Sequence, residues 1–194
     1  MGGNKRWCGL LLAVCLTVAL LVPPRGRALA QTQGVLRFIP QPLAAEEGTS
    51  FSVEVWAERV SNVYGFQAFI DFDPHILEVV RIEAGPFLNP GWKYFEYDNN
   101  LGQMTIAIVQ VAPSPPANGS GPLARIVFRA KASGESKLDF VSRSEKLHTY
   151  ICDGDGRVIP TEQVDGLVTV YAAGSVPAPG STGYRVLVPL LFRG

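Results

Sequence analysis

The stretch that decides the fold runs from 63 to 79 and reads VYGFQAFIDFDPHILEV. Apolar and polar side chains alternate through its first half, which is the period of a half-buried β-strand. One side of that strand carries the apolar residues Phe66, Ala68, Ile70 and Phe72. The step Asp73-Pro74 predicts a turn, and the β-branched segment 77–82 predicts the next strand.

Segments of the same kind recur along the rest of the chain. Turns rich in Gly, Pro and Asn separate them, and no helical period exceeds two turns. The composition, 47% hydrophobic and 18% charged, excludes a wholly disordered chain. We therefore expect an all-β domain over residues 31–172, a nine-stranded antiparallel jelly-roll β-sandwich. Besides the two segments above, the candidate segments for its strands are 35–39, 51–55, 93–98, 103–111, 123–130, 137–141, 147–152 and 166–171, of which about nine are expected to form the sandwich.

The first 30 residues have the layout of a secretory signal peptide. A short positive segment, Asn4-Lys5-Arg6, precedes the apolar run 8–22, and Ala28-Leu29-Ala30 offers a cleavage site. The run is shorter than the roughly 20 residues of a membrane span, so we expect a secreted, extracellular chain without a transmembrane span. An uncleaved N-terminal anchor is the alternative.

Cleavage after Ala30 changes the charge and the cysteine content. Residues 31–194 keep 13 Lys and Arg against 17 Asp and Glu, a net charge of −4. This balance argues against nucleic acid as a partner, because phosphate binding relies on clustered cations. Cys152 remains as the one cysteine, which rules out an intramolecular disulfide. The sequence shows no residue that would activate its thiol as a nucleophile, so we expect Cys152 to be a small buried side chain.

The composition changes after Tyr171. Residues 173–183 are rich in Pro and Gly and predict a linker. Residues 184–194, YRVLVPLLFRG, are apolar with two arginines and too short to span a bilayer. They form either a final strand on the domain or an exposed tail for sorting or anchoring at the cell surface.

Three segments together resemble the cohesin domain family. They are 63–79, quoted above, 121–134, GPLARIVFRAKASG, and 165–170, DGLVTV. The resemblance implies a jelly-roll sandwich, similar to that of some carbohydrate-binding modules. It also implies a non-catalytic module that binds dockerins, which are calcium-loaded helical modules of polysaccharide-degrading enzymes. The Gly65-Phe66-Gln67 pattern is similar to the second and non-cellulosomal types of cohesin.

The period of two predicts which side chains could meet a partner. If Phe66 faces the core, then Gly65, Gln67 and Phe69 face outward. In the strand 103–111 the outward residues are Thr105, Ala107 and Val109. The resemblance implies that these two strands are neighbours in the dockerin-binding sheet. We expect an exposed apolar patch of Phe69, Ala107 and Val109 there, unless a loop or the tail 184–192 covers it.

Two further groups of residues are weaker candidate sites, and each has a structural role as its alternative. Trp92, Tyr94 and Tyr97 could form a sugar-stacking platform, although core packing is the favoured role for such aromatic rings. Asp153, Asp155 and Glu162 have the spacing of part of a calcium loop. Its first position would be Ile151, which offers no side-chain ligand, so a Gly-rich hairpin turn is favoured.

The sequence thus favours a secreted binding module that docks a dockerin-like partner, in polysaccharide degradation or in surface assembly. A carbohydrate-binding module and a structural cell-surface protein are the alternatives. We expect no cofactor and no enzyme activity, because no catalytic constellation can be assembled from these residues.

Overall fold

The computed structural model describes residues 33–41, 43–175 and 185–186, and within them the regular structure is entirely β. The strands are β1 (Gly34–Ile39), β2 (Leu43–Glu46), β3 (Ser50–Val63), β4 (Gly65–Asp71), β5 (Leu77–Ala84), β6 (Pro90–Asp98), β7 (Gln103–Gln110), β8 (Ala117–Ala130), β9 (Gly134–Phe140), β10 (Tyr150–Cys152), β11 (Val158–Ile159), β12 (Thr161–Val164), β13 (Gly166–Tyr171) and β14 (Arg185–Val186). No helix in the described part is long and apolar enough to cross a membrane.

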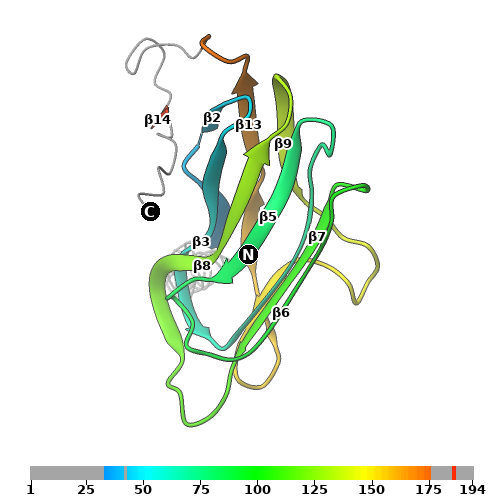
Figure 1. Ribbon diagram of the computed structural model, residues 1–194. Helices are drawn as coiled ribbons and strands as arrows, with labels where there is room; N and C mark the ends of the chain where they lie inside the picture. Colours follow the sequence, from blue (N-terminus) through cyan, green and yellow to red (C-terminus); the bar gives the residue numbers. More distant parts are fainter. Residues whose placement is uncertain (1–32, 42, 176–184, 187–194) are drawn as a thin grey trace, which may run out of the picture. The chain divides into compact units, whose positions relative to one another are not determined.

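The strands form two sheets that pack as a jelly-roll sandwich (Figure 1). One sheet has the order β12-β1-β3-β8-β5. The other has the order β11-β10-β4-β9-β13-β2-β14, and β7 and β6 extend it sideways from β4. One core of buried side chains draws on both sheets, with Phe38, Phe66 and Phe128 among its largest members. The predicted all-β sandwich is confirmed.

The alternation read from the sequence is present in the two central strands. In β4 the side chains of Phe66, Ala68 and Ile70 are at most 2% exposed. In β7 the alternating residues Met104, Ile106 and Ile108 face the same core and are equally inaccessible. β4 and β7 pair in antiparallel register along their whole length, from Gly65 opposite Val109 to Asp71 opposite Gln103.

The strand inventory differs from the expected one in its short members. β2, β11 and β12 were not predicted, and the predicted strand 147–152 is reduced to β10. Segments of two to four residues have too few positions to show a period. Three pairs, β1 with β12, β13 with β2 and β14 with β2, are parallel, whereas the remaining pairs are antiparallel as expected.

The predicted linker and tail are described in small part. Arg185 and Val186 form β14 and lie in register with Leu43 and Ala44 of β2. The predicted signal peptide, most of the linker and the rest of the tail lie outside the described residues.

The hairpin of β6 and β7 is anchored at its turn. Gly102 adopts φ +67, and a Cβ atom there would lie 2.1 Å from the carbonyl oxygen of Phe72, which explains the glycine. The side-chain amide of Asn99 accepts from the backbone N–H of Val79 at 2.7 Å and donates to its carbonyl at 3.0 Å. Because Val79 belongs to β5 of the other sheet, this pair holds the hairpin in place across the edge of the sandwich.

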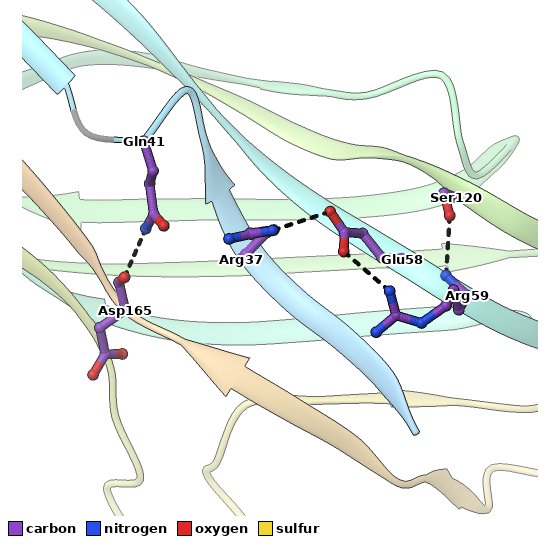
Figure 2. Close-up of polar contacts among 6 residues, drawn as sticks. All are labelled: Arg37, Gln41, Glu58, Arg59, Ser120 and Asp165. Carbon is purple, nitrogen blue, oxygen red and sulfur yellow. Dashed lines mark hydrogen bonds and ion pairs between the residues drawn. The ribbon is translucent and has the colours of Figure 1, made fainter. Parts of the chain in front are cut away.

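Charged side chains pair on strands of the five-stranded sheet. Arg37 of β1 contacts Glu58 of β3 at 3.4 Å, and Arg59 approaches the second carboxylate oxygen of Glu58 at 3.6 Å (Figure 2). The Ser120 hydroxyl accepts from the backbone N–H of Arg59, where β3 bulges and φ is +54. On β5, Arg81 pairs with Glu83 at 2.8 Å.

Candidate partner-binding face

The outer side of four adjacent strands forms the candidate site, which we call the docking face. Its strand order is β6-β7-β4-β10, and directly opposite residues in antiparallel neighbours point to the same side. Trp92 therefore lies in one row with Val109, Gly65 and Cys152, and Tyr94 lies in the next row. The docking face comprises Gly65, Gln67, Trp92, Tyr94, Glu96, Thr105, Ala107, Val109, Tyr150 and Cys152.

Small side chains line the middle of this face. Gly65 is buried, and a Cβ atom on it would lie 2.7 Å from the Cys152 sulfur. Ala107 of β7, which lies opposite Gln67, is half-buried. The side-chain amide of Gln67 donates to the backbone carbonyl of His148 at 3.1 Å. The predicted residues Gly65, Gln67, Thr105, Ala107 and Val109 are thus brought together, and Val109 is 40% exposed.

The expected exposure of Phe69 is wrong. Its ring points outward from β4, as predicted, but it is only 6% exposed. Residues 141–149, which we call the strap, cover it. The backbone N–H of Val141 donates to the Phe69 carbonyl at 2.9 Å, and the Thr149 hydroxyl bonds to both the N–H and the carbonyl of Phe69. A loop, the first of the two expected exceptions, therefore covers the centre of the predicted patch.

An ion pair joins the strap to β4. The Arg143 guanidinium donates to Asp71 at 2.6 Å and lies 5.8 Å from the centre of the Phe69 ring. Covering a phenyl ring with a guanidinium keeps the ring from water while the cation stays partly hydrated. The strap follows β9 by sequence and reaches β4 only through tertiary pairing. No local pattern around Phe69 could have shown this.

The favoured core role of the β6 aromatics is also wrong for three rings. Trp92, Tyr94 and Tyr97 are 54%, 44% and 41% exposed, whereas Phe95 is half-buried and packs against the core. Trp92 and Tyr94 are parallel, with an interplanar angle of 5° and centroids 6.3 Å apart. Trp92 and Tyr94 are exposed because they lie on the outward side of β6, opposite Val109 and Ala107. Tyr97 lies opposite the inward-facing Met104 and is exposed because β6 is an edge strand of the described structure.

Sequence reasoning missed Glu96 and Tyr150 as members of this face. Glu96 shares the side of Tyr94, and the Tyr94 hydroxyl donates to its carboxylate at 2.6 Å. That hydrogen bond raises the pKa of the Tyr94 hydroxyl. The alternation along β6 could have placed Glu96 on this side, had the strand been assigned to the face. Tyr150 required knowledge that β10 pairs with β4.

The weak calcium candidate forms a turn. Residues 153–157 join β10 to β11, and the Asp153 carboxylate accepts from the backbone N–H groups of Asp155 and Arg157 at 2.9 Å. The favoured hairpin turn is confirmed. Glu162 lies on β12 of the other sheet. Within the described ranges, no three His, Cys, Asp or Glu side chains gather as a metal site.

Burial raises the pKa of the Cys152 thiol, and the nearby Asp153 charge raises it further. A thiol with a raised pKa forms less thiolate and is a weaker nucleophile at neutral pH. This agrees with a packing role for Cys152 against Gly65.

Nearly the whole sandwich matches a known protein family. The cohesin domain model matches residues 38–170. The chain belongs to the cohesin domain family. Cohesin domains are non-catalytic binding modules and are typically extracellular. A comparison with curated proteins gave no match.

Solved cohesins share the fold at low sequence identity. A non-cellulosomal cohesin from the hyperthermophilic archaeon Archaeoglobus fulgidus is 18% identical, with a TM-score of 0.57 over 72% of this chain and 91% of that one. The third cohesin ScaC of Acetivibrio cellulolyticus, solved with the ScaB dockerin, is also 18% identical, with a TM-score of 0.62 over 72% and 99%. A type II cohesin from the same organism is 16% identical, with a TM-score of 0.61 over 70% and 95%.

Proposed function

We propose that this cohesin is a secreted docking module that binds a dockerin-like helical partner through the docking face. Its place would be outside the cell, in polysaccharide degradation or surface assembly, as a non-catalytic protein nearer the second, non-cellulosomal type. The observation that carries the proposal is the exposed apolar and aromatic surface of Trp92, Tyr94 and Val109 on one side of the sandwich. Large apolar side chains gathered in this way mark partner sites.

On the described strands of the five-stranded sheet, Val80 is the one large apolar side chain that is exposed. Several of the charged side chains of this sheet pair with one another, as Arg37 does with Glu58 and Arg81 with Glu83. Surface charges that are already paired lose hydration on docking and gain little in return. The contrast between the two sheets favours the docking face as the partner surface.

The size of the face suits a helix. Four strands at about 4.8 Å spacing span about 14 Å, and a helix with its side chains is about 10–12 Å wide. The side chains of Gly65 and Ala107 in the middle of the face are small, and larger rings lie on β6 and β10 to either side. A helix could therefore approach the sheet closely between these rings.

A pull-down from the native secretome tests the proposal, with residues 31–194 as bait, with and without calcium. We expect calcium-dependent capture of a dockerin-bearing protein. Val109→Asp should abolish the capture, because it buries a charge in the contact. Val80→Asp is the matched control, since Val80 is 42% exposed on β5 of the other sheet. Capture that survives Val109→Asp would place the site elsewhere.

Carbohydrate binding is a second candidate, favoured by the parallel exposed rings of Trp92 and Tyr94. Sugars stack on such rings through their apolar faces. Retention on insoluble polysaccharide that is lost in Trp92→Ala would support it, and absence of retention on any glycan would refute it. Anchoring at the cell surface through the tail remains a prediction. It requires that deletion of 184–194 release the protein into the medium.

A further inference from the structure

The edge strand β6 carries two rings and a carboxylate in one line on the docking face. Trp92, Tyr94 and Glu96 alternate along the strand and lie opposite Val109, Ala107 and Thr105 of β7, respectively. The two rings are parallel and about half exposed. The Tyr94 hydroxyl donates to Glu96 Oε2 at 2.6 Å, which holds the carboxylate beside the rings.

The Glu96 carboxylate forms no ion pair with any Lys or Arg in the described part of the chain. Arg143 of the strap is engaged by Asp71. Lys93 follows Trp92 but lies opposite the inward-facing Ile108, and it lines a groove with Ile82 and Phe95 at the sandwich edge. The negative charge of Glu96 is therefore available to a partner.

We propose that Trp92, Tyr94 and Glu96 form a subsite for an arginine side chain of the docked partner. This inference rests on the proposed docking function. A guanidinium is planar, so it can stack on an aromatic ring while its N–H groups donate to a carboxylate. A lysine ammonium lacks the planar surface and would use the subsite less well. The net charge of −4 over residues 31–194 also favours a basic partner surface.

A displayed library tests the subsite without a known partner. The probe is a set of calcium-loaded dockerin modules, randomised at exposed helix positions and selected on residues 31–194. We expect arginine to be enriched at one helix position on the wild-type chain and not on Glu96→Gln. For an isolated binder, replacing that arginine with glutamine should weaken binding about tenfold on the wild type. On Glu96→Gln the same replacement should have much less effect.

Control variants keep the outcomes distinct. Glu83→Gln removes an exposed carboxylate from the other sheet and should leave the arginine preference unchanged. Tyr94→Phe keeps the ring but frees the carboxylate, and should weaken the preference in part. A library that yields no binder would count against docking itself. Binders without an arginine preference, or with the same preference on Glu96→Gln, would overturn the subsite and leave docking standing.

Discussion

Gln110 ties three segments together at the end of β7. Its side chain is 6% exposed and donates to the carbonyls of Val63 at 3.2 Å and Pro115 at 3.1 Å. Its carbonyl accepts from the backbone N–H of Asn89 at 2.8 Å. Asn89 precedes β6, so this amide also sets where the strand with the exposed aromatic rings begins.

We expect Gln110→Leu to lower the free energy of unfolding by about 2–4 kcal/mol. The side chain keeps its approximate volume, but the buried Val63 carbonyl loses its side-chain donor, which costs about 1–3 kcal/mol. The bonds to Pro115 and Asn89 are partly exposed, so water replaces them in part, and together they add about 1 kcal/mol. For a domain of this size the melting temperature should fall by about 5–12 °C.

Urea unfolding followed by tryptophan fluorescence measures this change. Gln103→Leu is the matched control, because Gln103 begins the same strand and lies half-buried without a side-chain hydrogen bond in the described structure. Its effect should stay within about 0.5 kcal/mol. If Gln110→Leu proves as stable as Gln103→Leu, the three hydrogen bonds do not hold these segments, and the reasoning is refuted.

Three further predictions address the strap, the hairpin turn and a carboxylate. Thr149→Val removes the hydroxyl that bonds both backbone groups of Phe69, and should cost about 1–3 kcal/mol and speed amide exchange at Phe69. Gly102→Ala forces a side chain into φ +67 and against the Phe72 carbonyl, and should lower the melting temperature. Burial and two neighbouring carboxylates raise the pKa of Asp139 above 3.8, so the folded state binds a proton more tightly than the unfolded chain. The contribution of Asp139 to stability therefore falls as the pH rises through its raised pKa. Asp139→Asn should be more stable than the wild type at about pH 7, and this difference should disappear at about pH 3.

For each of these three predictions, one result would contradict it. Unchanged exchange at Phe69 in Thr149→Val would mean that the strap is held by other contacts. A wild-type melting temperature in Gly102→Ala would show that the turn can shift. For Asp139→Asn, a stability difference that does not vary with pH would contradict the raised pKa.

The sequence predicted the inner sides of the central strands correctly, because alternation is a local property of a strand. Phe66, Ala68 and Ile70 can be read from their own neighbours, as can the turn at Asp73-Pro74. The fold class followed from many such segments. The strongest part of the site prediction, the pairing of Gly65, Gln67, Ala107 and Val109, depended on the resemblance to cohesins and on this alternation.

Exposure was the property that local patterns could not supply. Phe69 points away from the core by its position in β4, yet the strap, which begins 72 residues later at Val141, covers its ring. Trp92 and Tyr94 are large aromatic residues of a kind usually buried. They reach solvent because they lie on the outward side of β6, beside Val109 and Ala107, where the strap does not cover the sheet.

The sequence by itself determined that the chain forms β-strands, which side of each central strand faces the core, and that the fold is a cohesin sandwich. The first two follow from period-two patterns and turn residues within a few positions of one another, and the third follows from the resemblance of three segments to cohesins. The tertiary structure decided which outward residues a partner can reach, since strand neighbours and covering loops come from distant parts of the chain. It replaced Phe69 with Trp92, Tyr94 and Glu96 as the exposed side chains of the docking face.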